Sequence, residues 1–319
     1  EIKGEDGEPG RAAVRPRLSE KFWLRYHNLG AERLAELVGI VRLADHPDVT
    51  LRRLVFYQIL LEPYEEEKEV SRFTTTGVVA CNANGTVLHG RSIAYGFRFI
   101  ARGRRMHLGE FALDLTFKRG GQPLFSAVGF PGRVGVVSGM VLQGSTPVSV
   151  TCYPTGFSAN RLLYEDELKL GGIPLQLAVR EALEANLGFR GTVDHLMRRN
   201  LSFESSYTVA GPGPCEAALV HSAGQVLLAS AARAQEFFLS RTGIEFVDPK
   251  LGQWYMAKKN NHDMALETDV GRMLGEISRE HLTPAALMSV MQRLPVPQLA
   301  VLSVDSPGLG PQASLFKWA

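Results

Sequence analysis

Cysteine is scarce in this sequence. Among 319 residues there are three cysteines, Cys81, Cys152 and Cys215, and no two of them have CxxC spacing. Three cysteines cannot build the full disulfide framework that staples a small secreted domain. The scarcity therefore favours a reducing or neutral compartment. Neither Cys152 nor Cys215 has a base close by in the sequence, so we expect both to be inert packing residues.

The sequence also lacks a strong charge of one sign and a long apolar run. Its formal net charge is +2, so the molecule as a whole has no general attraction for nucleic acids or anionic membranes. No apolar stretch is long enough to cross a bilayer, and no signal peptide is recognisable. We therefore expect no transmembrane segment.

Metal-binding patterns are missing as well. The eight histidines include no HxH or HExxH arrangement, so neither a metal site nor another cofactor is expected. His89 follows a predicted turn, and we expect it to pack at the hairpin rather than to bind a metal.

What the sequence contains is a helical start followed by closely spaced strands. Apolar residues recur at helical spacing over residues 31–44 and 50–61, separated by the helix breakers at 45–47. Later helices are predicted at 174–187, from a cap at Thr192, at 270–277 and at 283–294. Between these pairs, alternating apolar residues predict strands. The predicted strands lie at 111–117, 123–128, 134–140, 148–153, 207–209, 217–221, 226–230, 236–241, 254–258, 299–304 and 314–318. Helix pairs between blocks of strands indicate antiparallel sheets covered by helices, an α+β layered sandwich.

Residues 73–80 and 85–91 predict two short strands joined by the turn at 82–85, with Arg91 at the end of the second strand. The motifs here are TTGVVA at 75–80 and GTVLHGRSIAYG at 85–96. Further motifs follow in order, namely LDLTFKR at 113–119, GFPGRVG at 129–135 and GQWY at 252–255. Together they resemble the acid ceramidase and N-acylethanolamine acid amidase family over most of residues 31–318. The resemblance implies the αββα sandwich of N-terminal-nucleophile hydrolases, with residues 18–72 similar to the family's α-subunit and residues 73–319 to its β-subunit. Residues 1–17 are expected to be a flexible basic arm.

Members of this family cut their own chain before a cysteine, whose new α-amino group then serves as the base for its thiol. The family's His-Gly-Arg motif matches residues 89–91, so its arginine corresponds to Arg91. The nucleophile position, sixteen residues before that arginine, is then Thr75. The family's aspartate is replaced by Ala94. Asn260 matches the asparagine that holds the oxyanion, and the late arginine corresponds to Glu267. The resemblance therefore implies two retained roles, at Arg91 and Asn260.

Three interpretations of Thr75 stay open. The first is a catalytically inactive homologue that serves as a structural or interaction subunit of a larger assembly, such as an organellar complex or a ribosome. The second is an active amidohydrolase for N-acyl amides (ceramides or N-acylethanolamines), in which Thr75 is the self-processed nucleophile. The third is a β-hairpin that merely looks like the family's. The first is favoured, because the changes at Ala94 and Glu267 remove charges that the family chemistry needs. The compartment is left open, with a mitochondrial location favoured over a lysosomal one.

A local basic cluster follows the hairpin. It consists of Arg98, Arg102, Arg104 and Arg105, interleaved with Phe97 and Phe99. One interpretation is an exposed basic loop, and the other is a contact with RNA, a phosphate group or an acidic partner.

Overall fold

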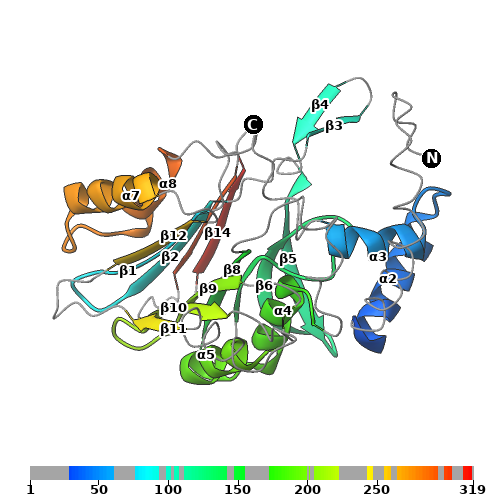
Figure 1. Cartoon of the computed structure of the whole chain (residues 1–319), viewed down its shortest axis with the longest axis horizontal. Coiled ribbons are helices and arrows are strands. Elements are labelled where there is room, and N and C mark those ends of the chain that lie inside the picture. Colours follow the sequence, from blue (N-terminus) through cyan, green and yellow to red (C-terminus); the bar gives the residue numbers. More distant parts are fainter. Residues whose placement is uncertain are drawn as a thin grey trace, which may run out of the picture.

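The computed structural model describes residues 29–60, 76–92, 98–101, 104–107, 111–141, 147–154, 172–199, 201, 205–222, 243–246, 255–259, 264–293, 298–303 and 312–317. Within them, two large antiparallel sheets lie one against the other (Figure 1). The predicted strands at 226–230 and 236–241 and the predicted basic arm at 1–17 fall outside the described residues.

The larger sheet has seven strands, in the order β11-β10-β9-β8-β7-β6-β5. They are β5 (Leu113–Arg119), β6 (Gln122–Gly129), β7 (Ser138–Val141), β8 (Ser149–Pro154), β9 (Ser205–Ala210), β10 (Ala217–Ser222) and β11 (Gly243–Phe246). Every neighbouring pair is antiparallel. The order along the sheet follows the order along the chain, as expected when successive strands are joined to their neighbours.

The smaller sheet has five strands, in the order β12-β1-β2-β13-β14. They are β1 (Thr76–Cys81), β2 (Val87–Ser92), β12 (Tyr255–Lys259), β13 (Gln298–Ser303) and β14 (Gln312–Lys317). β1 therefore lies between β2 and β12, although β12 is far from it in the sequence.

Helices cover the two outer faces. α4 (Leu175–Ala185) and α5 (Gly188–Arg198) pack on the seven-stranded sheet, whereas α7 (Met264–Ile277) and α8 (Pro284–Gln292) pack on the five-stranded sheet (Figure 1). α8 begins as the sequence predicts, because Thr283 accepts a hydrogen bond from the amide of Ala286 and Pro284 occupies the first turn. The resulting order of helix, sheet, sheet and helix confirms the predicted α+β, αββα sandwich.

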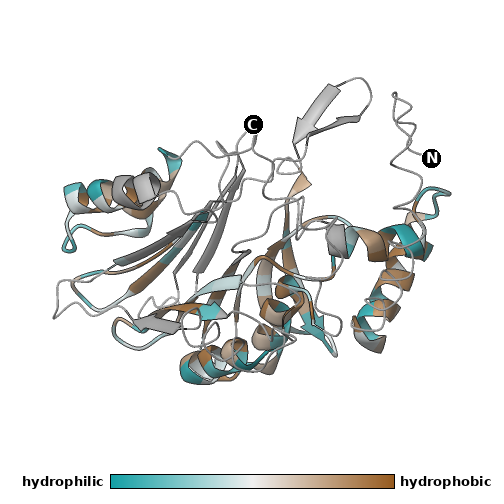
Figure 2. Ribbon diagram, in the orientation of Figure 1, coloured by the Kyte–Doolittle hydropathy of each residue, from teal (hydrophilic) through white to brown (hydrophobic). Residues whose placement is uncertain are grey.

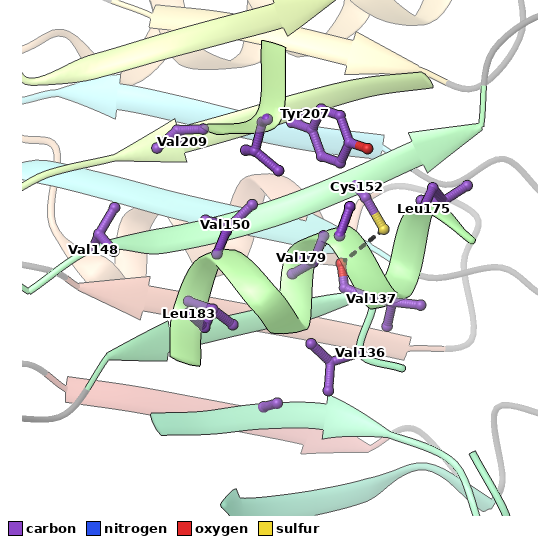
Figure 3. Packing of buried hydrophobic residues seen from close by; sticks show 14 of the residues in the cluster. Val136, Val137, Val148, Val150, Cys152, Leu175, Val179, Leu183, Tyr207 and Val209 are labelled. Carbon is purple, nitrogen blue, oxygen red and sulfur yellow. Dashed lines mark hydrogen bonds between the residues drawn. The ribbon is translucent and has the colours of Figure 1, made fainter. Parts of the chain in front are cut away.

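The main core lies between α4, α5 and the seven-stranded sheet. Hydrophobic residues, brown in Figure 2, run along these strands and α4. Figure 3 shows Val150 and Val209 from the strands packed beside Val179 and Leu183 of α4. Cys152 is buried here as a free thiol that contacts the Val137 carbonyl, so its predicted packing role is confirmed.

The helical segment before β1 docks against the side of this core. It comprises α2 (Gly30–Ala44) and α3 (Leu51–Leu60), and α2 ends at Asp45, whose φ of 41° is left-handed. Gln58 of α3 is buried, donating to the Gly132 carbonyl at 2.7 Å and accepting from the Val134 amide at 2.9 Å. An amide side chain that satisfies two backbone groups in this way fixes both the place and the orientation of α3.

An ionic cluster fixes α2. Arg180 of α4 is buried and pairs with Glu36 of α2 at 2.5 Å and with Glu184 at 2.8 Å. Arg33 of α2 also reaches Glu184, at 2.5 Å. Burial opposes ionisation of Glu184, but the hydrogen bonds and charges of Arg180 and Arg33 hold the pKa of its carboxyl below the usual value.

Two local predictions are wrong. Thr192 is not a helix cap, because α5 already begins at Gly188, whose φ of 66° lets the chain turn directly out of α4. The basic cluster is not a loop, because Arg98, Arg104 and Arg105 lie in a two-stranded hairpin of β3 (Arg98–Ala101) and β4 (Arg104–His107). Arg102 is outside the described residues. The β-branched and aromatic residues Ile100 and Phe99 favour a strand here.

Candidate functional site

The sequence-predicted site lies at the end of the five-stranded sheet where β1 begins. Thr76, the first residue of β1, is the Cα partner of Ser92 at the end of β2 and of Lys259 at the end of β12. Thr75 immediately precedes Thr76, and Asn260 immediately follows Lys259. Thr75, Asn260 and Ala94 themselves lie outside the described residues. The strand pairing therefore brings Thr76 and Lys259, the neighbours of Thr75 and Asn260, together at the same end of the five-stranded sheet.

Arg91 is the predicted site residue that the structure describes fully. It lies in β2, where its Cα partner on β1 is Gly77. Gly77 follows Thr75 by two residues in the sequence. Its side chain is 2% exposed and crosses to the seven-stranded sheet, where Nη1 donates to the Val137 carbonyl and, at 3.1 Å, to Ser138 Oγ. Arg91 thus links the two sheets.

His89 makes a second link, two residues earlier in β2. Its Nδ1 lies 2.8 Å from Ser149 Oγ and its Nε2 lies 2.7 Å from Thr208 Oγ1. Burial, helped by the charge of Arg91, lowers the pKa of His89 to about 3. The ring is therefore neutral near pH 7, with one nitrogen donating and the other accepting. The predicted packing of His89 at the hairpin is confirmed.

Hydroxyl groups continue this polar layer between the sheets. Ser138 Oγ and Thr151 Oγ1 are 2.8 Å apart, and Ser206 Oγ lies 2.8 Å from His221 Nδ1. Sequence reasoning missed all of these residues. A signal was present for the strand residues Thr151 and Ser206, because serine or threonine alternates with apolar or aromatic residues in the segments 148–152 and 206–209. Such alternation places one kind of side chain on each face of a strand.

Glu267 belongs to a different layer. It lies in the first turn of α7, and α7 packs on the outer face of the five-stranded sheet through Val270 and Leu274 against Val78. Arg91 reaches from the same sheet in the opposite direction, towards Ser138. The helix that carries Glu267 and the guanidinium of Arg91 are therefore on opposite sides of the sheet.

The basic hairpin stands apart from both large sheets (Figure 1). In its register, Arg98 is opposite His107, Arg104 is opposite Ala101 and Arg105 is opposite Ile100. Three of the four predicted basic residues thus come together within one short hairpin.

Cys215 is not the inert packing residue expected from the sequence. It forms a disulfide with Cys81, across a sequence separation of 134 residues and a Cα–Cα distance of 5.2 Å. Spacing could not reveal the pair, because Cys81 ends β1 in one sheet and Cys215 lies in the turn between β9 and β10 of the other. Packing of the sheets brings the two cysteines together.

Two further features, clusters of metal-binding side chains and membrane-spanning helices, are not found in the residues that the structure describes. No set of three or more histidine, cysteine, aspartate or glutamate side chains there could hold a metal ion. Nor is any described helix long and apolar enough to cross a bilayer.

The resemblance to amidases is confirmed by comparison with known proteins, although no family model matches the chain. The chain is 24% identical over 249 residues to the N-acylethanolamine-hydrolyzing acid amidase of Caenorhabditis elegans, covering 76% of this chain and 64% of that protein. It is 28% identical over 152 residues to the protein of that name from Rattus norvegicus, covering 48% and 39% of the two chains. For the Mus musculus protein, the identity is 24% over 235 residues, with 72% and 58% covered. The matches thus span less than two thirds of each of these relatives.

The fold is confirmed by a solved structure. The structure of the Caenorhabditis elegans N-acylethanolamine-hydrolyzing acid amidase ortholog superposes with a TM-score of 0.58 and 19% identity, covering 73% of this chain and 94% of that chain.

Proposed function

We propose that this chain, a distant relative of the N-acylethanolamine-hydrolyzing acid amidases, is a catalytically inactive homologue that serves as a structural or interaction subunit of a larger assembly. An organellar complex or a ribosome is the kind of assembly we favour, with a mitochondrial location preferred to a lysosomal one.

The proposal rests on Ala94, the residue that stands where the resemblance implies the family's aspartate. An α-ammonium group at Thr75 would need a nearby carboxylate to position it and to stabilise its charge. The methyl group of Ala94 offers neither a charge nor a hydrogen-bond acceptor. Threonine alone would be acceptable as a nucleophile, so this loss weighs more than the exchange at Thr75.

The presence of Arg91 is compatible with an inactive protein. Its Nη1 donates to the Val137 carbonyl and to Ser138 Oγ, and these contacts join the two sheets. The arginine therefore has a structural task that does not depend on catalysis.

A second candidate function is an amidohydrolase for N-acyl amides in which Thr75 is the nucleophile, Arg91 positions it and Asn260 holds the oxyanion. The register of β1 favours it, since Thr76 is paired with both Ser92 and Lys259. A chain cut before Thr75 would then begin next to Thr76. The strand partners of Thr76, Ser92 and Lys259, are the sequence neighbours of Arg91 and Asn260.

Hydrolysis of a fluorogenic N-acyl amide distinguishes the two functions. The chain and a Thr75→Ala control are assayed across pH 4 to 8. We expect no difference in hydrolysis between them, because an inactive homologue has no activity to lose when the candidate nucleophile is removed. Saturable hydrolysis by the chain that disappears in Thr75→Ala would refute the inactive homologue and establish the amidohydrolase.

The basic hairpin is the contact surface that we assign to an RNA partner of such an assembly. Four arginines within residues 98–105 could neutralise about four phosphates, so affinity should fall on the order of tenfold to a hundredfold between 50 and 200 mM salt. A variant with Arg104→Glu and Arg105→Glu should lose both binding and salt dependence. Replacing the exposed Arg293 by glutamine is the matched control and should change little. Salt-independent binding, or equal binding by all three proteins, would count against the assignment.

A further inference from the structure

Three separate segments meet at the Cys81–Cys215 disulfide, at one end of the sandwich. Cys81 is the last residue of β1, and Cys215 lies in the turn between β9 and β10. The amide of Cys215 donates to the Gly85 carbonyl at 2.8 Å, which ties that turn to the turn after β1. The amide of Ala83 in turn donates to the carbonyl of Arg279, between α7 and α8, at 3.2 Å.

The side chain of Arg279 lies directly against both sulfurs. Its Nη2 is 3.7 Å from Cys81 Sγ and 3.6 Å from Cys215 Sγ. Its Nε donates to the carbonyls of Cys81 at 3.2 Å and of Asn82 at 3.1 Å, which holds the guanidinium in place. A disulfide carries no charge, so the cation contributes little while the bond is intact. It would stabilise a thiolate as soon as the bond opens, because an opposite charge at this distance favours the ionised thiol.

The two sulfurs differ in access. Cys81 is fully buried, whereas Cys215 is partly exposed. Thiol–disulfide exchange requires an attacking thiolate to reach one sulfur while the other leaves, and a better stabilised leaving thiolate leaves faster. The geometry thus provides an accessible sulfur to attack, a sheltered leaving group and a fixed cation beside it.

We propose that Cys81–Cys215 is an exchange-active disulfide that reacts with dithiol reductants. The thiolate of the dithiol attacks Cys215 Sγ and forms a mixed disulfide. The Cys81–Cys215 bond breaks, and its electron pair goes to Cys81 Sγ as a thiolate beside Arg279. The second thiol of the reductant, once deprotonated, attacks its own sulfur in the mixed disulfide and releases the Cys215 thiolate. The reductant leaves as a disulfide, so two electrons have passed to the protein.

Opening this bond would loosen the contact between the two sheets at the end of β1. The bond closes a loop of more than one hundred residues, and cross-links of that span constrain the unfolded chain strongly. We expect reduction to lower the melting temperature by roughly 5–10 °C. The backbone contacts at Gly85 and Ala83 would remain, so the fold would persist. This reaction does not depend on whether Thr75 is catalytic.

The rate of reduction tests the role of Arg279. The folded protein is treated with dithiothreitol, and at intervals an excess of N-ethylmaleimide is added under native conditions to stop the reduction and label the thiols, which are then mapped by mass spectrometry. Cys81 and Cys215 should become labelled together, while the buried thiol of Cys152 stays unlabelled and shows that the protein remains folded. Arg279→Gln should slow reduction on the order of threefold to tenfold, and Arg279→Lys should retain most of the rate. Arg293→Gln, a control on an exposed arginine nearby in sequence, should leave it unchanged.

A second measurement separates chemistry from loosening of the fold. In the reduced protein, the pH at which Cys81 is half-maximally alkylated should rise by about one unit in Arg279→Gln. With glutathione disulfide, Cys81→Ser should form the mixed disulfide at Cys215, and Cys215→Ser should react far more slowly at the buried Cys81. Resistance to dithiothreitol until the protein is denatured, an unchanged alkylation profile in Arg279→Gln, or faster reaction at Cys81 would each overturn the proposal.

Discussion

The two faces of the seven-stranded sheet are built in opposite ways. The face under α4 and α5 is apolar, with residues such as Val150, Val209 and Leu183 packed together (Figure 3). The face towards the five-stranded sheet carries hydroxyl groups that bond to His89 and Arg91. Both faces are buried, and they share the same strands. The difference shows that burial alone does not determine composition in this fold.

The two layers stabilise the protein by different means. Apolar contacts are nondirectional and scale with the area removed from water, so the helix side depends on volume. Hydrogen bonds in a buried layer depend on direction, and each lost partner leaves a polar group unsatisfied. The polar layer includes Arg91, one of the site residues that the family resemblance implies.

The largest effect is expected on the apolar face, at Phe125 of β6. Its ring is fully buried and stacks on Phe117 with centroids 4.4 Å apart. Phe125→Ala should lower the free energy of unfolding by about 3–5 kcal/mol, since it removes a large side chain and leaves a cavity. Phe125→Leu, which keeps most of the volume, should cost clearly less. Urea unfolding measures both, and equal losses would show that this face does not depend on volume.

An intermediate effect is expected at His89 in the polar layer. His89→Leu should cost about 1–3 kcal/mol at pH 7, because the hydroxyls of Ser149 and Thr208 lose their shared partner. Urea unfolding with the original protein beside it measures this difference.

The same variant should also change the pH dependence of stability. The pKa of His89 is lowered to about 3 in the folded protein, against 6.5 when unfolded, so the unfolded chain binds the extra proton between these values. The contribution of His89 is therefore complete above pH 6.5 and is lost as the pH falls towards 3, at up to about 1.4 kcal/mol per unit. His89→Leu lacks this dependence, so its disadvantage should shrink at pH 5. If the difference in the free energy of unfolding between the original protein and His89→Leu stays constant from pH 7 to pH 5, this would contradict a buried, neutral histidine.

The smallest effect is expected at the hydroxyl pair of Ser138 and Thr151. Ser138→Ala and Thr151→Val should each cost about 1 kcal/mol, and the double variant should cost less than their sum because one hydrogen bond is lost in all three. Ser289→Ala, on the exposed side of α8, is the control and should stay within about 0.5 kcal/mol. If the loss in the double variant equals the sum of the two single losses, the two hydroxyls are not coupled through a hydrogen bond.

Much of the fold could be predicted from the sequence, because it depends on local patterns. Alternation over residues 111–117 and the cap at Thr283 are local signals, and the order of the short family motifs along the sequence indicates the sandwich. The helix start at Gly188 could not be predicted in this way, because a glycine after a helical pattern indicates the end of that helix, whereas Gly188 begins the next one.

The rest of the site depends on residues that meet only after folding. The partners of His89 come from β8 and β9, and Cys81 finds Cys215 in the other sheet. No spacing rule relates such pairs, since their distance in sequence is set by the topology of the sheets. Arg91 could be predicted because the family motif around it is local, whereas its contacts with Val137 and Ser138 could not.

The mass of the intact protein tests the inactive homologue most directly. The purified chain and its Thr75→Ala control are incubated at pH 4.5 and at pH 7 and then measured without digestion. We expect one species of unchanged mass in every sample, because the proposed inactive homologue has Ala94 in place of the carboxylate that would position the α-amino group of Thr75. Two fragments in the original chain, one ending at Thr74 and one beginning at Thr75, with none in the control, would contradict this account.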